Sequence, residues 1–287
     1  MQEQICFING SFVPAGEASV SVFDRGLLFG DGVYEVLRIR NAVVFRPQAH
    51  YLRMQSGLDT LGIGNPWNEQ EFACLCAELA QRNRVRGGHV YLQVTRGVAP
   101  RTHLVPRNLQ PTLIGFAAEA DLPKWKDRPS GLTAITVSDP RWATCNIKTT
   151  MLLPNSLAKQ RAADAGAYEA VFVSEDGLVR EGASTNVFVV LDDVIYTHPD
   201  DQRILPGITR AIVLDLAQAE GLTVKQQPVQ VERLQDAHEV FLTGTTTDVG
   251  PVIRIDDRPV GNGKIGPVTA ALMHKYSELL ADETGTD

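Results

Sequence analysis

Two short, mostly apolar runs at the start of the chain flank a turn dipeptide, and this pattern predicts a β-hairpin. Residues 5–8 and 11–13 are mostly apolar and lie on either side of Asn9-Gly10. This dipeptide tolerates the positive φ that both central positions of a tight two-residue turn require. We therefore expect the chain to begin as a sheet.

Further along, the apolar spacing changes to that of a helix. Asn68 followed by Glu71 has the form of a capping box, which marks the start of a helix. The apolar residues that then recur at helical spacing are Phe72, Leu75, Cys76 and Leu79. We expect this helix to pack on the first sheet.

The periodicity is lost between Ala117 and Ser130, where residues 121–130 form a polar, proline-bounded segment. Such a segment is typical of a connector. The sequence therefore predicts a smaller N-terminal α/β domain over residues 1–120, a connector over 121–130, and a larger C-terminal domain over 131–287.

Strand and helix patterns mix throughout the second part. The strands are expected at residues 133–137, 169–173, 186–191, 194–197 and 239–242, and the helices at 154–165 and 208–220. Gly221 is suited to end the second helix. Residues 282–287 are expected to be a frayed tail. The fold class is therefore α/β with mixed α+β character.

Composition and charge narrow the class of function. A chain of 287 residues with 44% apolar content can bury a substantial core. A net charge of -7 argues against a nucleic-acid partner, and no apolar run approaches the roughly 20 residues of a membrane span. The four cysteines show neither a disulfide framework nor zinc-site spacing, so we expect reduced thiols, no metal and a cytoplasmic protein.

One lysine has a context suited to covalent catalysis. Lys148 follows Asn146 and Ile147 and precedes Thr149, so it lies among small and apolar residues. Desolvation favours the neutral amine that attacks an aldehyde to form a Schiff base. The alternative is a partly buried structural lysine.

Two further segments match what pyridoxal phosphate requires. Glu181 precedes small residues that would allow a ring to approach closely, and a carboxylate can hold the proton on the cofactor's pyridine nitrogen. Gly207 leads into a predicted helix whose first amides, at Ile208 and Thr209, would bind phosphate. The threonine-rich residues 243–247 add hydroxyl groups. A surface glutamate, an ordinary helix start and a strand edge are the alternative interpretations.

Arg101 and His103 lie two residues apart in a loop restrained by Pro100. An arginine fork binds a carboxylate in bidentate fashion, and a histidine can donate a supporting hydrogen bond. The pair is therefore a candidate carboxylate clamp. An exposed basic loop is the alternative.

Together these residues resemble the fold-type IV, or class IV, family of pyridoxal phosphate-dependent aminotransferases, and within it they are most similar to the D-amino-acid aminotransferases. The resemblance covers nearly the whole chain. The segments that carry it are residues 29–36, 50–53, 96–103, 147–148, 181–188, 207–210 and 243–252. The family implies a smaller N-terminal α/β domain and a larger C-terminal pseudo-barrel domain.

The resemblance also implies a role for each matching residue. Lys148 would form the Schiff base and shuttle protons, and Glu181 would contact the pyridine nitrogen. The residues expected to hold the phosphate are Arg53, Ile208, Thr209 and Thr245. Arg141 would lie near the phenolic side of the cofactor and Leu205 against its ring. Tyr34, Arg101 and His103 would fix the substrate α-carboxylate, the last two reaching in from the other subunit of a homodimer.

The implied reaction is transamination between a D-amino acid, such as D-alanine or D-glutamate, and a 2-oxo acid, such as 2-oxoglutarate or pyruvate. Gly244 departs from the serine of close relatives, and Arg38 and Arg40 bear on the preferred side chain. An L-branched-chain aminotransferase or an aminodeoxychorismate lyase of the same fold is an alternative. The Tyr-x-Gly-x-Arg segment of the former is not found near residues 91–103. A non-catalytic phosphate-binding protein is an alternative of another class.

Overall fold

The computed structural model describes residues 4–122 and 130–285. They form two compact units. The first contains residues 4–122, 147–151 and 282–285, and the second contains 130–146 and 152–281. Most of the predicted connector, residues 123–129, lies outside the described residues. The division into residues 1–120 and 131–287 remains a proposal, to which the structure adds that two short later segments pack with the first unit.

The first unit is built on an antiparallel sheet in the order β2-β1-β6-β5-β3-β4. Its strands are β1 (Ile5–Ile8), β2 (Ser11–Pro14), β3 (Gly32–Arg40), β4 (Val43–Val44), β5 (Gly87–Thr95) and β6 (Thr112–Glu119). The predicted hairpin is confirmed, because β1 pairs with β2 and both Asn9 and Gly10 have positive φ, 48° and 92°. Gly10 makes this turn possible without steric strain.

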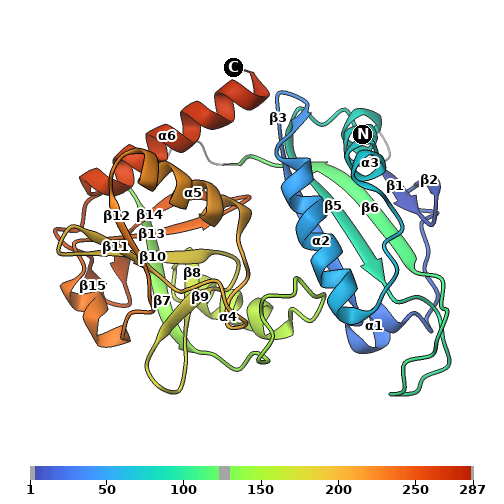
Figure 1. Ribbon diagram of the computed structural model, residues 1–287, viewed down its shortest axis with the longest axis horizontal. Helices are drawn as coiled ribbons and strands as arrows, with labels where there is room; N and C mark the ends of the chain where they lie inside the picture. The colour runs from blue at the N-terminus through green and yellow to red at the C-terminus, as the bar shows by residue number, and fades with distance from the viewer. Residues whose placement is uncertain (1–3, 123–129, 286–287) are drawn as a thin grey trace. The chain divides into compact units, whose positions relative to one another are not determined.

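Helices cover one face of this sheet (Figure 1). They are α2 (Pro47–Leu61) and α3 (Glu69–Arg82), and a short α1 (Arg25–Phe29) precedes β3. The capping box of α3 is confirmed, with Asn68 accepting from the Glu71 amide at 2.9 Å and Glu71 accepting from the Asn68 amide at 2.8 Å. Phe72, Cys76 and Leu79 are fully buried in the core of the unit, as the helical spacing predicts.

The second unit contains a nine-stranded sheet that closes on itself. Its strands are β7 (Leu132–Ser138), β8 (Glu169–Val173), β9 (Val179–Gly182), β10 (Asn186–Leu191), β11 (Val194–Thr197), β12 (Thr223–Gln226), β13 (Glu239–Gly244), β14 (Asp248–Ile255) and β15 (Arg258–Pro259). The main order is β12-β11-β10-β13-β14-β7-β8-β9, and β9 also pairs with β10. This last pairing, of Glu181 with Asn186, closes a barrel.

Helices pack on the outside of the barrel strands (Figure 1). The α4 helix (Leu153–Asp164) contacts β7 and β8, and α5 (Ile208–Ala219) contacts β12 and β13. A 3₁₀ segment (Val231–Asp236) precedes β13, and α6 (Pro267–Thr284) ends the chain. The rings of Phe188 and Phe241 stack on neighbouring strands with centroids 4.7 Å apart. The predicted mixed α/β fold with a barrel of strands in its second part is therefore confirmed.

The expected frayed tail is wrong over its first residues. The α6 helix continues through Thr284, whose side chain is buried. The Arg46 guanidinium pairs with the Glu283 carboxylate, and the Asn41 amide donates to the Gly285 carbonyl at 2.8 Å. These partners lie far away in the sequence, so the local composition of the tail gave no sign of them.

In residues 4–122 and 130–285, no helix is both long enough and apolar enough to cross a bilayer.

The α3 capping box provides a test of the fold. Asn68→Ala removes the acceptor of the Glu71 amide and should lower the free energy of unfolding by about 1 kcal/mol. Urea denaturation measures this change. Gln70→Ala, at an exposed position of the same first turn, is the matched control and should stay within about 0.5 kcal/mol of the parent protein. Equal values for the two variants would contradict the capping assignment.

Candidate active site

Lys148 is fixed beside the strand that carries Tyr34. Residues 147–151 attach to β3 through its backbone, since the Tyr34 amide donates to the Lys148 carbonyl at 3.0 Å and Val33 pairs with Thr149. The Ile147 side chain enters the core of the first unit. As a result the Lys148 Nζ lies 3.3 Å from the Tyr34 hydroxyl and 4.3 Å from the centre of its ring. The structure therefore brings these two predicted residues together.

Arg53 is held by a buried carboxylate on the other face of the same strand. Glu35 is fully buried and accepts from Arg53 Nε and Nη2, both at 2.7 Å, and from His50 Nδ1 at 2.6 Å. Burial alone would raise the pKa of Glu35, but the charges and hydrogen bonds of Arg53 and His50 outweigh burial and lower this pKa to about 2. Burial also lowers the pKa of His50 itself. This cluster sets the orientation of the Arg53 guanidinium.

Arg101 and His103 lie in the exposed loop between β5 and β6. The Arg101 guanidinium lies 5.5 Å from the Phe29 ring, and the His103 ring lies 5.8 Å from it. Among the described residues, neither side chain makes a hydrogen bond or an ion pair, and no contact joins either of them to Tyr34. The structure thus groups Arg101 with His103, apart from the contacts of Tyr34 and Lys148.

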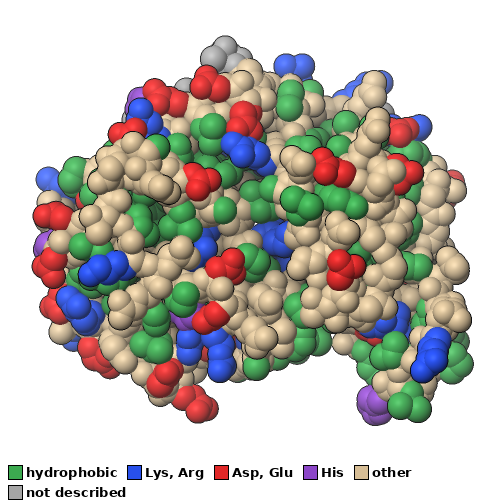
Figure 2. Space-filling model, in the orientation of Figure 1, with side chains coloured by type: hydrophobic (Ala, Val, Ile, Leu, Met, Phe, Trp, Pro, Cys, Tyr) green, Lys and Arg blue, Asp and Glu red, His purple; other side chains and the backbone are tan. Residues whose placement is uncertain are grey.

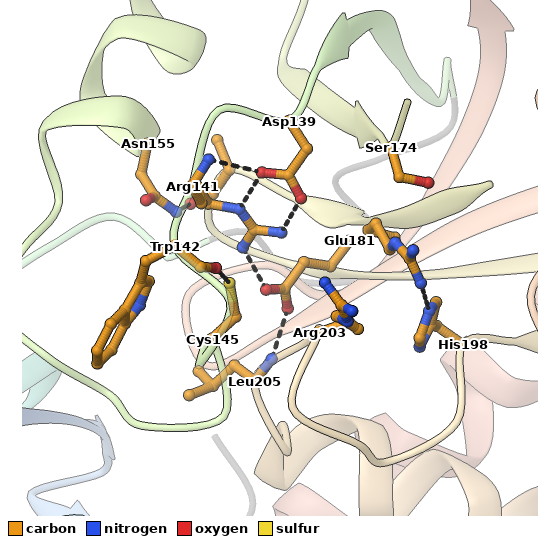
Figure 3. Close-up of polar contacts among 12 residues, drawn as sticks. Asp139, Arg141, Trp142, Cys145, Asn155, Ser174, Glu181, His198, Arg203 and Leu205 are labelled. Carbon is orange, nitrogen blue, oxygen red and sulfur yellow. Dashed lines mark hydrogen bonds and ion pairs between the residues drawn. The ribbon is translucent and has the colours of Figure 1, made fainter. Parts of the chain in front are cut away.

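Glu181 lies at the closure of the barrel in the second unit, where its carboxylate is surrounded by donors (Figure 3). One oxygen accepts from Arg141 Nη1 at 2.5 Å. The other accepts from the Leu205 amide at 3.0 Å and from Asn186 Nδ2 at 3.2 Å. Arg141 is held in turn by both oxygens of Asp139, each at 2.9 Å.

The electrostatics of this carboxylate are unusual. Burial raises the pKa of Glu181 to about 7, although Arg141 and the Leu205 amide act in the opposite direction. Near neutral pH, a further positive charge close to this carboxyl group would therefore favour its ionised form. A ligand that carries a protonated nitrogen would stabilise the carboxylate form.

The start of α5 lies against the same cluster. Asn186 Nδ2 also donates to the Leu205 carbonyl at 2.9 Å, and a Cβ atom on Gly207 would overlap with Asn186 Oδ1. Only glycine therefore fits at this helix start. Within the described parts of the chain no side chain caps α5, so the first amides, at Ile208 and Thr209, point out of the helix end. Asn186 thus joins the Glu181 carboxylate to a helix N-terminus.

The predicted threonine-rich segment, residues 243–247, covers the end of β13 and the turn after it. Thr243 on β13 pairs with Asn186, and its buried hydroxyl oxygen has no hydrogen-bond partner in the part of the chain that the structure describes. Thr245 is half-buried in the following turn. The Thr247 hydroxyl in this turn is hydrogen-bonded to the Tyr168 hydroxyl at 2.8 Å. No contact found among the described residues joins Thr245 to Glu181.

Sequence reasoning did not single out four residues that hold the predicted ones: Glu35, His50, Asp139 and Asn186. An ionisable residue at a core position of a strand could have indicated Glu35, since Val33 and Leu37 share its side of β3. Asp139 and Asn186 carry no comparable signal, because their roles come from side-chain directions within the folded barrel.

Comparison with known proteins identifies the family. The model of the family Amino-transferase class IV matches residues 32–255, which is most of the chain. The protein belongs to this family, as the sequence predicted.

Individual relatives show which members of this family the chain is similar to. The chain is 41% identical to a D-alanine aminotransferase of Bacillus licheniformis, over 96% of this chain and 97% of that one. Among solved structures it is similar to a branched-chain amino acid aminotransferase from Escherichia coli, with a TM-score of 0.89, 27% identity and coverage of 99% and 96%. It is also similar to the branched-chain aminotransferase of the archaeon Thermoproteus uzoniensis with norvaline, with a TM-score of 0.89, 27% identity and coverage of 98% and 96%. The predicted fold type is confirmed.

One solved relative bears on the cofactor. A further branched-chain amino acid aminotransferase, which is 31% identical and has a TM-score of 0.88, was solved with pyridoxamine 5'-phosphate. The similarity covers 99% of this chain and 95% of that one.

The raised pKa of Glu181 gives a test of the site in the ligand-free protein. Between the unfolded pKa of 4.5 and the folded pKa of about 7, the folded protein keeps a proton that the unfolded chain releases. The free energy of unfolding should therefore fall by up to about 3 kcal/mol as the pH rises through this window. Urea denaturation of the parent protein and of Glu181→Gln measures the contribution by difference. Identical pH dependence in the two proteins would contradict the assignment.

Proposed function

We propose that the protein is a pyridoxal phosphate-dependent aminotransferase that exchanges an amino group between D-amino acids and 2-oxo acids. The observation that carries the proposal is the buried Glu181 carboxylate, which Arg141, Asn186 and the Leu205 amide hold in place and which can pair with a protonated ring nitrogen. Membership of the family and the similarity to D-alanine aminotransferases support the same reaction.

The described residues fit the cofactor. Glu181 offers an anionic partner to a pyridinium nitrogen, and Leu205 lies next to it through its backbone. The uncapped start of α5 offers the amides of Ile208 and Thr209 to a phosphate, and the buried Thr243 hydroxyl has no partner among the described residues. We assign Arg53 and Thr245 to the phosphate and Arg141 to the phenolic side of the ring. Bound pyridoxal phosphate supplies an electron sink for the bond that breaks at the substrate α-carbon.

Lys148 is the residue that moves the proton in this proposal. Its Nζ would hold the cofactor covalently, and as a free amine it would take up the substrate α-proton and give it back. The Tyr34 hydroxyl, 3.3 Å from Nζ, orients the amine.

Stereochemical preference follows from where the α-carboxylate is held. A lysine fixed on one face of a planar cofactor reaches only one arrangement of substituents around the α-carbon. We assign the α-carboxylate to Tyr34, Arg101 and His103, with the last two supplied by a second copy of the chain. The exposure of the Arg101 and His103 side chains supports that source.

A second copy is also favoured by apolar side chains exposed in the first unit. The residues are Val20, Val22, Phe23, Leu27, Val98, Leu104 and Val105. Backbone contacts between Asp24 and Val98 and between Phe23 and Ala99 hold the two segments together, so these side chains form one surface. Such a surface is typical of an interface between chains. We propose a homodimer, located in the cytoplasm, where the four free cysteines would stay reduced.

Product analysis tests the reaction. Purified protein with pyridoxal phosphate, incubated with D-alanine and 2-oxoglutarate, should yield pyruvate and D-glutamate. Chiral chromatography separates the glutamate enantiomers. Transfer from L-leucine with none from D-alanine would contradict the D-specific reaction and favour a branched-chain aminotransferase, which is what the similar solved structures are. Absence of any transfer would contradict the aminotransferase assignment for this chain.

Lys148→Ala tests the proton carrier. Loss of Nζ should lower kcat by at least about 10³-fold, because both the covalent attachment and the proton transfer depend on it. A coupled assay of pyruvate release measures the rate. Lys225→Ala, at an exposed position of β12, is the matched control and should keep the parent rate. Activity of the Lys148 variant close to that of its control would contradict the role.

Arg101→Ala tests the carboxylate contact. Loss of a charge-assisted hydrogen bond should raise KM for D-alanine by about 10- to 100-fold while the cofactor stays bound. Initial rates over a range of D-alanine concentrations, with the visible absorbance as a measure of bound cofactor, separate the two effects. An unchanged KM would remove Arg101 from the substrate site.

A further inference from the structure

We propose that Arg25 is a positioning residue for substrate binding, because its guanidinium fixes the backbone of the loop that carries Arg101 and His103. The inference rests on the proposed function, in which those two side chains bind the substrate α-carboxylate. Arg25 itself does not contact the substrate in this account. It acts by fixing the segment between the two binding residues.

The Arg25 side chain has a fixed position. It begins α1 and is only 4% exposed. Its Nε donates to Asp31 Oδ2 at 2.8 Å, and its guanidinium carbon lies 4.7 Å from the centre of the Phe29 ring. A planar guanidinium held by a carboxylate and an aromatic ring has little rotamer freedom. Arg25 is therefore a rigid donor.

The Arg25 guanidinium binds backbone carbonyls of the loop that carries Arg101 and His103. Arg25 Nη1 donates to the carbonyl of Thr102 at 2.8 Å, with a longer contact of 3.5 Å to the carbonyl of Leu104. Thr102 is the residue between Arg101 and His103. Fixing its peptide therefore fixes the directions in which both neighbouring side chains leave the backbone.

Beyond Arg25, little holds this loop in the part of the chain that the structure describes. Among the described residues, Arg25 is the only source of hydrogen bonds to residues 100–109. The remaining contacts of the two binding residues are with the Phe29 ring, at 5.5 Å for Arg101 and 5.8 Å for His103. The Arg25 guanidinium also packs over the Phe29 ring, so Arg25 and Phe29 together hold the middle of the loop.

The base of the loop is anchored separately. The Arg25 amide donates to the Gly97 carbonyl at 2.9 Å, and Asp24 joins α1 to Thr95 through a side-chain hydrogen bond at 3.0 Å. Gly97 has φ of 100°, and a Cβ atom there would overlap with the Gln110 carbonyl oxygen. These contacts do not involve the Arg25 side chain, so the loop base survives its replacement.

A loop fixed before the substrate arrives does not have to lose that conformational freedom on binding. The carboxylate contact is made in the bound substrate as well as in the transition state. Its weakening therefore raises KM more than it lowers kcat. A residue that served only the stability of the fold would instead change the amount of folded protein and leave KM unchanged.

Arg25→Met is the variant of choice. It keeps the length of the side chain but removes the donors, and Asp31 keeps its ion pair with Arg96 Nε at 2.8 Å, so no buried carboxylate is left unpaired. KM for D-alanine and KM for 2-oxoglutarate should each rise about tenfold, while kcat falls by less than about threefold. Both substrates carry the carboxylate, so both should respond. Arg25→Lys keeps the charge and one donor direction and should give an intermediate rise.

Arg96→Lys is the matched control. Arg96 binds the same Asp31 oxygen, but its other donors go to the carbonyls of Leu61 and Gly62 rather than to the loop. The control should lower the melting temperature and leave KM unchanged. An unchanged KM in Arg25→Met, or an equal rise in Arg96→Lys, would overturn the inference. Should Arg25→Met fail to fold, Arg25→Lys decides by the same comparison.

Arg101→Ala separates this inference from the proposed function. A rise of KM in Arg101→Ala without any rise in Arg25→Met contradicts the role of Arg25 alone. An unchanged KM in Arg101→Ala contradicts the carboxylate contact itself, and the role of Arg25 falls with it. A rise of KM in both variants, with the melting temperature of Arg25→Met close to that of Arg96→Lys, supports positioning over a general loss of stability.

Discussion

The carboxylate of Glu181 closes the barrel of the second unit, and much of the candidate site depends on its burial. A buried carboxylate must be satisfied by donors, and here they come from three separate segments: Arg141, the Leu205 amide and Asn186. Meeting this requirement fixes the loop before α5 and therefore the helix start that follows Gly207. The constraint that stabilises the barrel closure also places an anion-binding helix end near a carboxylate.

Burial raises the pKa of Glu35 in the first unit as well, but there the net shift of the pKa is downward. Arg53 and His50 outweigh the cost of burying this carboxylate and keep it ionised, whereas Glu181 has a pKa near 7 despite Arg141. Arg141 divides its hydrogen bonds between Glu181 and Asp139, while Arg53 gives Glu35 two. One carboxylate is thus fully compensated and structural, and the other remains ready for a cationic partner. This difference is the physical basis of the proposed cofactor site around Glu181, whose contacts with Arg141 and Leu205 Figure 3 shows.

The face of the molecule drawn in Figure 2 shows charged side chains of both signs interspersed with apolar ones. A mixed surface with a net charge of -7 agrees with small-molecule substrates rather than with a polyanionic partner. We assign the exposed apolar side chains around residues 20–27 and 98–105 to contacts with a second copy of the chain. The same two segments are joined through Arg25, so the proposed interface and the positioning of the clamp loop share one structural base.

The elements that the sequence predicted well are those with local signals. The Asn9-Gly10 hairpin, the Asn68 capping box and the strands at 169–173 and 186–191 all follow from turn chemistry and spacing. Long-range contacts were not predictable in this way. The pairing of Arg46 with Glu283 orders the C-terminal residues, and Asp139 and Asn186 act on Glu181 only after the barrel has closed.

For the site, Lys148 and Tyr34 were predicted separately and are in contact, whereas the anchor of the Arg101 loop at Arg25 has no signature in the loop itself. Residues that bind are easier to recognise from sequence than residues that position them, because positioning depends on the folded backbone.

The central claim is that Lys148 and Glu181 hold pyridoxal phosphate for reaction with D-amino acids. The most direct measurement is the visible absorbance spectrum of the purified protein with cofactor, recorded before and after addition of D-alanine and, in a separate sample, of L-leucine. The account predicts a visible band that D-alanine removes and L-leucine leaves in place, because only the cofactor in its amino form lacks that band. A protein that shows no visible band after incubation with pyridoxal phosphate, or one whose band is removed by L-leucine alone, would contradict it.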